Sequence, residues 1–234
     1  MRIFYHNQIS ENDNYFLLDK NESKHILKVL RKKINDIIHL TNGKGYLFKV
    51  KIFEIIDNKC NLKIVDKIYE KNNNYKINVA IAPTKSNERT EWFLEKSTEI
   101  GIESITPIIC YNSERRSIKA ERFDKIVISA MKQSERFYKP KLDTLVDFKT
   151  YIKNCKSELK LIAYCNENKN HLSNYLNLNN KNISIIIGPE GGFSESEINY
   201  ALKMGFKTIS LGKKRLRTET AGIVAVQILS SLNL

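Results

Sequence analysis

The chain of 234 residues lacks the features that would place it in a membrane or in an oxidising compartment. No apolar run approaches the roughly 20 residues of a membrane-spanning helix, and the opening MRIFYHNQISENDN has no apolar signal-peptide core. The cysteines form no CxxC pair and no Cys/His metal spacing; they are Cys60, Cys110, Cys155 and Cys165. We therefore expect free thiols, no metal and a cytoplasmic protein.

The common phosphate-binding glycine patterns are also absent. Neither GxxxxGK[ST] nor GxGxxG occurs among the nine glycines. A nucleotide-hydrolysing or dinucleotide-using enzyme would need one of these motifs, because their backbone amides cradle phosphates. The sequence therefore argues against that class of enzyme.

The composition has little acidic charge to balance its basic residues. Lys and Arg number 39 against 26 Asp and Glu, which gives a net charge of +13, and both the part up to residue 72 and the remainder are basic. A polyanionic partner follows, with nucleic acid ahead of membrane because no basic amphipathic helix stands out. The alternative is that many lysines only solubilise a chain rich in Asn, Ile and Lys.

An Asn-rich stretch, EKNNNYK at residues 70–76, separates two regions of different rhythm. Before it, strand-like segments at 36–40, 46–56 and 60–70 are joined by turn-forming residues and predict a small antiparallel β domain over residues 1–72. One helix, ESKHILKVLRK, precedes these strands. We expect this helix to pack through its apolar side chains, Ile26, Leu27, Val29 and Leu30.

After this stretch, predicted strands alternate with predicted helices, which indicates an α/β domain over residues 73–234. The expected strands are 77–83, 104–110, 159–165, 183–188 and 207–212, and the expected helices are near 86–100, 119–135, 194–204 and 218–232. Several of the strands are continuous apolar runs, as in parallel strands covered on both faces. We expect a mostly parallel sheet flanked by helices.

The segment IIIGPEGGFSESEI, residues 185–198, predicts a strand, a tight turn and a helix. Ser194 and Glu197 have the spacing of a capping box, and Phe193 and Ile198 that of a hydrophobic staple. Gly205 is expected to end the helix. The turn should therefore be rigid and lie at the carboxyl end of a central strand, where open parallel sheets bind ligands.

The ligand of this turn should not be a phosphate, because the charge of Glu190 would repel it. Its bare backbone amides and carbonyls suit an uncharged ring such as adenine, or a cationic group, better. The alternative is a Gly-Pro turn that serves only to reverse the chain.

A second constellation is SLGKKRLRTETAGIVAVQILSSL, residues 210–232. Gly212 ends a strand, and four cations then precede a helix, a favourable arrangement for an anion. Thr218 is expected to cap this helix, and Glu219 adds an acid to its first turn. A buried stripe is expected at Ala221, Val224, Ala225, Ile228, Leu229 and Leu232. Gly222 allows close backbone approach, for instance to a second subunit; the alternative for the basic loop is a solvated turn.

A third stretch, ISAMKQSERFYKPKL, interleaves charges with aromatic residues, as nucleic-acid surfaces often do. Its members of interest are Ser134, Arg136, Phe137 and Tyr138. The alternative is that the aromatic residues belong to the core, as they often do at helix ends.

Together, IIIGPEGGFSESEI and LGKKRLRTETA resemble the ribosomal RNA uridine-N3 methyltransferases of the small subunit, a family of the SPOUT superfamily of knotted methyltransferases. RIF (2–4), HILKVLR (25–31), TKSNERTEWFLEKSTEIGI (84–102) and KQSER (132–136) extend the resemblance over nearly the whole chain. The chain departs from relatives at Lys132, where Glu is common, and at Glu135 and Asn35, where Gly is common. Asn35 is tolerable if its backbone is left-handed.

The resemblance implies an N-terminal PUA-like β-barrel that binds RNA, over residues 1–72, and a SPOUT domain with a C-terminal trefoil knot, over residues 73–234. It also implies a homodimer with the site near the subunit interface. The cofactor would be S-adenosylmethionine, held bent by the two loops. The implied cofactor-binding residues are Ile187, Gly188, Pro189, Glu190, Gly191, Gly192, Leu211, Gly212, Leu216, Arg217, Thr218 and Ala221.

The implied activity is methylation of N3 of a specific uridine in 16S ribosomal RNA. Arg217 is the candidate that stabilises the uracil oxygens, and Glu219 or Glu190 would orient or accept the N3 proton. The alternative is that Arg217 grips an RNA phosphate and Glu219 serves only the helix terminus. The candidates for RNA phosphate contact are Arg2, Lys24, Arg31, Arg89, Arg115, Arg116 and Arg136.

Two other functions remain open from the residues. One is a SPOUT enzyme that acts on transfer RNA or large-subunit RNA. The other is a non-catalytic RNA-binding factor of ribosome assembly, which would not bind S-adenosylmethionine.

Overall fold

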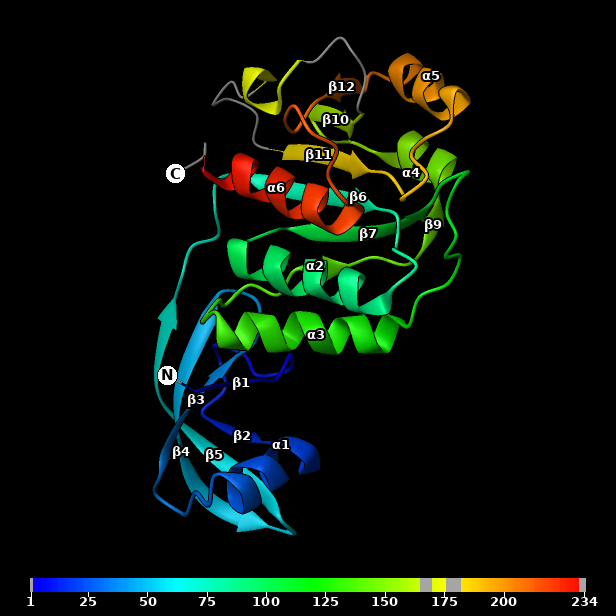
Figure 1. Cartoon of the computed structure of the whole chain (residues 1–234). Coiled ribbons are helices and arrows are strands. Elements are labelled where there is room, and N and C mark those ends of the chain that lie inside the picture. The colour runs from blue at the N-terminus through cyan, green and yellow to red at the C-terminus, as the bar shows by residue number, and fades with distance from the viewer. Residues whose placement is uncertain (1, 165–169, 176–181, 232–234) are drawn as a thin grey trace. The chain divides into compact units, whose positions relative to one another are not determined.

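A computed structural model describes residues 2–164, 170–175 and 182–231 (Figure 1). The chain divides into two compact units, one of residues 1–72 and 128–139, the other of residues 73–127 and 140–234. The segment 128–139 thus groups with the first unit, although the division drawn from the sequence places it in the second domain. Within the described ranges, no helix is both long and apolar enough to cross a membrane.

The first unit contains a five-stranded sheet in the order β1-β3-β4-β5-β2. Its strands are β1 (Ile3–Tyr5), β2 (Tyr15–Leu17), β3 (Ile37–Thr41), β4 (Tyr46–Ile56) and β5 (Lys59–Tyr69). All its pairs are antiparallel except β1 with β3. The three longer strands confirm the prediction, whereas β1 and β2 are too short to show the alternation by which strands are recognised.

The helix predicted before these strands is divided in the structure. Helix α1 (Lys20–Lys24) continues as a π-helical turn, η1 (His25–Val29), and the chain then turns at Arg31, whose φ is 53°. Ile26 is buried, but Val29 is 64% exposed, so its predicted packing was wrong. The wider π turn rotates the side chains that follow it, which a 3.6-residue period does not anticipate. Asn35 has a φ of 76°, the left-handed backbone that its position was expected to need.

Tyr138, from the stretch ISAMKQSERFYKPKL, is hydrogen-bonded within the first unit. The Tyr138 hydroxyl donates to the Glu70 carbonyl at 2.9 Å and to the Tyr69 hydroxyl at 3.2 Å. Desolvation of the Tyr138 hydroxyl is the main cause that raises its pKa to about 12, and the hydrogen bond to Tyr69 is the second. Glu135 adopts a φ of 55°, a backbone for which glycine is the usual residue.

The second unit contains a seven-stranded sheet in the order β12-β10-β11-β6-β7-β8, with β9 also pairing with β7. The strands are β6 (Lys76–Ile81), β7 (Ser104–Ile109), β8 (Lys141–Leu142), β9 (Val146–Asp147), β10 (Leu159–Ala163), β11 (Asn182–Ile187) and β12 (Lys207–Ile209). Every pair is parallel, which confirms the predicted α/β fold. The predicted continuation of the last strand to Gly212 was wrong, since β12 ends at Ile209.

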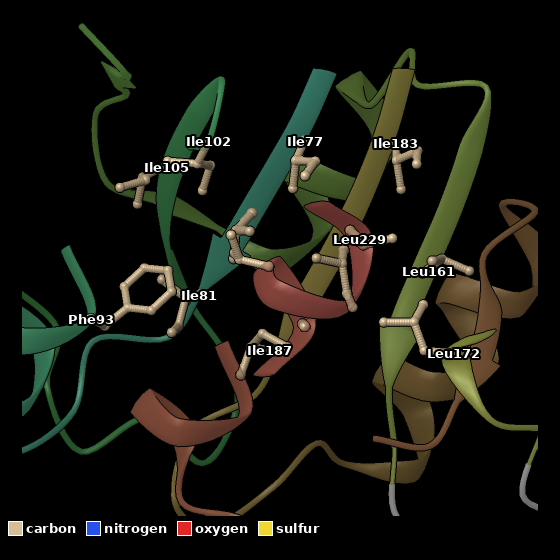
Figure 2. Packing of buried hydrophobic residues seen from close by; sticks show 14 of the residues in the cluster. Ile77, Ile81, Phe93, Ile102, Ile105, Leu161, Leu172, Ile183, Ile187 and Leu229 are labelled. Carbon is tan, nitrogen blue, oxygen red and sulfur yellow. The ribbon is translucent and has the colours of Figure 1, made fainter. Parts of the chain in front are cut away.

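Helices cover both faces of this sheet. On one face, α2 (Asn87–Ile100), the first part of α3 (Ala120–Gln133) and α6 (Thr218–Ser231) pack against Ile77, Val79 and Ile81 of β6. Figure 2 shows Ile77 and Ile81 of β6 with Phe93 of α2 and Leu229 of α6. On the other face, α4 (Phe148–Asn154) and α5 (Glu195–Lys203) pack against the alternate residues Ala80 and Ala82. A short 3-10 helix, η2 (Leu172–Tyr175), adds Leu172 to the first cluster. The sheet is therefore buried on both sides, as its apolar runs predict.

Gly222 of α6 approaches a neighbour within the same chain. A Cβ atom at this position would lie 2.6 Å from a ring carbon of Phe93 in α2. The close approach is therefore to α2, which explains the small residue without a second subunit. Cys60, Cys110 and Cys155 are free thiols. Cys165 and Leu232, for which a free thiol and a stripe position were predicted, lie outside the described residues.

Candidate active site

A cavity of about 770 Å³ lies at the carboxyl ends of β10, β11 and β12, beside the first turn of α6. It is lined by Arg89, Ala163, Tyr164, Ile187, Gly188, Pro189, Glu190, Gly191, Gly192, Phe193, Ile209, Leu211, Gly212, Lys214, Arg215, Leu216, Arg217, Thr218 and Ala221. Every residue predicted to bind the cofactor is in this lining. Arg217 lines the cavity as well, and Glu219 does not.

Residues 188–194, here called the glycine loop, are held by hydrogen bonds to their backbone. The Gly192 N–H donates to the Pro189 carbonyl at 2.9 Å, and Gly192 has a φ of 75°. The Asn112 amide, which follows β7, donates to the carbonyls of Gly191 and Gly192 at 3.3 and 3.1 Å. The loop is thus a closed turn that is also held from the end of β7, two strands away from β11 in the sheet.

Two glycines of this loop are required by space. A Cβ atom on Gly188 would lie 2.9 Å from the Phe193 ring, and one on Gly191 would lie 2.9 Å from the Cβ of Asn112. Real Cβ atoms do not approach so closely, so larger residues would displace the loop. At Gly188 and Gly191 the wall of the cavity is therefore bare backbone.

The start of α5 has the predicted capping box. The Ser194 hydroxyl accepts from the Glu197 N–H, and the Glu197 carboxylate accepts from the Ser194 N–H at 2.9 Å. The buried carboxylate also accepts from the Tyr111 N–H at 2.8 Å. Glu197 therefore ties the glycine loop to the end of β7, a role beyond capping. Phe193 and Ile198 belong to one apolar cluster, as the predicted staple requires.

Glu190 is held by partners on both sides of the loop. Its carboxylate accepts from the Lys85 N–H at 3.0 Å, and its carbonyl accepts from the Arg215 guanidinium at 2.7 Å. The loop around Lys85, after β6, is itself fixed by the Arg115 guanidinium, which donates to the Thr84 carbonyl at 2.8 Å and to the Lys85 carbonyl. Glu190 thus links three segments that are far apart in the sequence.

Residues 210–217, here called the basic loop, form the opposite wall. Lys214, Arg215 and Arg217 are exposed and line the cavity, while Lys213 is exposed but outside its lining. Gly212 has a φ of 146°, and its N–H donates to the Ser210 hydroxyl at 3.2 Å. This wall therefore carries long cationic side chains beside the amino end of α6.

Thr218 joins the two loops instead of capping α6. It is the first residue of the helix, and its hydroxyl donates to the Gly188 carbonyl at 3.0 Å. The Ala221 N–H donates to the Arg217 carbonyl at 2.7 Å, so Arg217 holds the position before the helix. The predicted cap was wrong by one residue because the hydroxyl has a tertiary partner.

Glu219 is buried, with a side chain only 7% exposed. One carboxylate oxygen lies 3.7 Å from the Arg89 Nε, and the other has no hydrogen-bond partner among the described residues. Arg89 comes from the first turns of α2 and lines the cavity.

The remaining candidates for RNA contact are spread over both units. Arg2, Lys24, Arg31 and Arg136 belong to the first unit, and the first three are exposed. Arg116, in the second, donates to the Tyr111 carbonyl at 3.4 Å.

Sequence reasoning did not find Lys85, Asn112 or Tyr164 as site residues. Each follows the carboxyl end of a parallel strand, β6, β7 and β10. The rule that ligands bind at this edge was therefore the available signal.

Comparisons with known proteins agree with this architecture. Residues 71–230 match the family model of an RNA methyltransferase domain, and residues 18–65 match that of an RNA methyltransferase PUA domain. The ribosomal RNA small subunit methyltransferase E of Buchnera aphidicola is 33% identical, over 99% of this chain and 93% of that protein.

Two solved structures are similar over nearly their whole length. A probable rRNA-methyltransferase from Porphyromonas gingivalis is 40% identical, with a TM-score of 0.90, over 100% of this chain and 98% of that one. The ribosomal RNA small subunit methyltransferase E from Neisseria gonorrhoeae, bound to S-adenosyl methionine, is 30% identical, with a TM-score of 0.87, over 99% and 98%.

A PUA-like domain followed by a parallel α/β domain with a cavity at its strand ends defines a class, the RNA methyltransferases. Within that class the match is full-length and specific. The chain belongs to the ribosomal RNA small subunit methyltransferase E family.

Proposed function

We propose that this protein transfers the methyl group of S-adenosylmethionine to N3 of a specific uridine in 16S ribosomal RNA. Its family membership supports the RNA substrate, and the donor bound to the Neisseria gonorrhoeae relative supports the cofactor. The observation that carries the proposal is the cavity in which all the predicted cofactor-binding residues meet.

The residues present fit the methyl donor. The cavity, about 770 Å³, has the size of a site for a small organic cofactor. Gly188 and Gly191 leave no room for side chains, so backbone amides and carbonyls are what a ligand meets there. Such a wall suits an adenine ring, and the apolar Leu211, Leu216 and Ala221 suit its faces. When bound, S-adenosylmethionine supplies an electrophilic sulfonium methyl.

The protein's task is then to prepare the nucleophile. Uridine N3 carries a proton, and charge develops on O2 and O4 as that proton leaves. We assign Arg217, exposed and in the cavity lining, to stabilise those oxygens. Glu190 and Glu219 are the carboxylates available to orient or accept the proton. In the competing assignment, Arg217 grips an RNA phosphate and Glu219 serves the helix terminus.

The uracil base must also leave any RNA helix to expose its Watson–Crick edge, which favours a single-stranded or extruded nucleotide. The proposed partners are accordingly 16S rRNA or the small ribosomal subunit, with Arg2, Lys24, Arg31, Arg89, Arg115, Arg116 and Arg136 as phosphate contacts. We further propose a cytoplasmic homodimer, a C-terminal trefoil knot, and domain limits of 1–72 and 73–234.

One experiment tests the proposal directly. The protein is incubated with labelled methyl donor and small ribosomal subunits lacking the modification, and the methylated position is mapped. Label at N3 of one uridine in 16S rRNA is the expected result. Label in transfer RNA or large-subunit RNA, offered in parallel, would redirect the assignment to another RNA. Absence of transfer to any uridine would refute it.

A further inference from the structure

Resting on the proposed function, we infer that Arg89 holds a phosphate of the target nucleotide at the cavity and that Glu219 positions Arg89 for this contact. Glu219 is then a positioning residue and not the proton acceptor. The RNA phosphate contact expected of Arg89 is thereby narrowed to the target nucleotide at the cavity, and the role of Glu219 is revised.

A general base has to come within hydrogen-bond reach of the proton it removes. Glu219 is not in the cavity lining, and its side chain is 7% exposed. The cavity-lining group beside it is the Arg89 guanidinium, whose Nε lies 3.7 Å from the Glu219 carboxylate. The ion pair with Arg89 therefore gives Glu219 a way to act on the cavity.

One oxygen of the Glu219 carboxylate is buried. Glu219 Oε2 has no hydrogen-bond partner among the residues the structure describes. A buried carboxylate oxygen without a partner is costly, so such groups call for an explanation. A bidentate pair with a guanidinium satisfies both oxygens at once and fixes the plane of the arginine. A bidentate pair between Arg89 and Glu219 would satisfy this oxygen and leave the remaining guanidinium N–H groups for an anion in the cavity.

The charged side chains that line the cavity are mostly cationic. Arg89, Lys214, Arg215 and Arg217 line the cavity, and the carboxylate of Glu190 is engaged by the Lys85 N–H. The methyl donor carries a sulfonium, an ammonium and one carboxylate, so it is itself a net cation. Four cationic side chains around a net cationic ligand favour binding of a further anion at the cavity, and an RNA phosphate is such an anion. The planar guanidinium of Arg89, 42% exposed, suits a phosphate.

A double-mutant cycle tests the inference. Arg89→Ala, Glu219→Gln and the double variant are compared by methyl transfer to unmodified small subunits and by calorimetric titration with S-adenosylmethionine. We expect each single variant to lower kcat/KM for the RNA substrate about 10- to 100-fold, the size of a charge-assisted hydrogen bond. The double variant should be no worse than Arg89→Ala, because the two residues act as one unit. The loss should appear mainly in KM, with donor affinity within twofold of the wild type.

A matched control exists on the same helix. Glu91 of α2 forms an ion pair with Arg122 of α3 at 2.6 Å, and neither residue lines the cavity. Arg122→Ala removes an ion pair from α2 without touching the site, so transfer should stay at the wild-type rate. Arg89→Lys keeps the charge but not the planar fork and should fall between the wild type and Arg89→Ala.

Several outcomes would overturn the inference while leaving the proposed function intact. Additive losses would show that Glu219 acts independently of Arg89. Loss of kcat in Glu219→Gln at saturating RNA, with Arg89→Ala near the wild type, would make Glu219 the proton acceptor. Weaker donor binding alone in Arg89→Ala would assign Arg89 to the donor's carboxylate. Failure of the wild-type protein to methylate any uridine would instead refute the proposed function.

Discussion

The glycine loop and the basic loop both run from a parallel strand to a helix at the same sheet edge, yet they are built in opposite ways. The glycine loop is held by residues outside it: Asn112, Lys85 and, through Glu197, Tyr111. The basic loop instead reaches toward the glycine loop, through Arg215 to the Glu190 carbonyl and through the residue after it, Thr218, to the Gly188 carbonyl.

Because of this difference, the glycine loop contributes a fixed shape to the site and the basic loop contributes charge. The glycine loop presents backbone in a fixed form, as a ligand recognised by its ring edges requires. The basic loop presents long cationic side chains, as a polyanion requires. Substitutions in the glycine loop should therefore change donor binding and stability, and substitutions of the cationic side chains in the basic loop should change transfer and RNA binding.

Arg217→Ala should have the largest effect and tests the charged side of the comparison. Removing a donor that stabilises developing charge lowers a rate about 10²- to 10³-fold. Single-turnover transfer should fall by this factor, while calorimetry should find donor affinity nearly unchanged.

Lys213 provides the control for Arg217. It is exposed in the same loop and outside the cavity lining, so Lys213→Ala should leave the transfer rate unaltered. Wild-type turnover by Arg217→Ala would end the assignment of Arg217 to the uracil oxygens. A loss confined to KM for RNA would favour the phosphate contact instead.

Gly188→Ala tests whether the rigid glycine loop shapes the donor site. The new Cβ atom would lie 2.9 Å from the Phe193 ring, and overpacking of this kind typically costs about 1–3 kcal/mol. Donor affinity and thermal stability should both fall. Gly188→Ala combined with Phe193→Leu should recover part of each, since the smaller side chain yields space. Unchanged donor affinity in Gly188→Ala would mean that the glycine loop is no wall of the donor site.

Local signals were sufficient to predict the glycine loop, because its strand, capping box and staple lie within fourteen consecutive residues, 185–198. They were insufficient to predict the residues that hold this loop from outside it. Lys85 and Asn112 reach the loop only because β6, β7 and β11 end at one edge, and a strand order cannot be read from a single sequence. Thr218 was assigned to the wrong partner for the same reason. Helix α4, of seven residues, was not predicted because it spans only two turns.

Thr218→Val should break the link between the two loops at a smaller cost. It removes the hydroxyl that donates to the Gly188 carbonyl at 3.0 Å, and a typical intramolecular hydrogen bond contributes about 1 kcal/mol. We expect a drop of this size in the free energy of unfolding, measured with urea, and a donor affinity a few-fold weaker. Thr218→Ser keeps the hydroxyl and should retain the wild-type donor affinity. Equal behaviour of the valine and serine variants would show that the link does not shape the site.

Lys214→Ala should have the smallest effect. It tests whether a cationic side chain that lines the same cavity as the glycine loop serves RNA binding alone. Lys214 is exposed and lines the cavity, so its ammonium can neutralise one phosphate without shaping the donor site. Loss of one phosphate contact should weaken RNA binding modestly and reduce the slope of log K against log salt by about 1. Filter binding across a salt series measures that slope, and donor titration should match the wild type. If donor affinity fell and the salt slope did not change, Lys214 would belong to the donor site, and the assignment of the cationic side chains of the basic loop to RNA would be wrong.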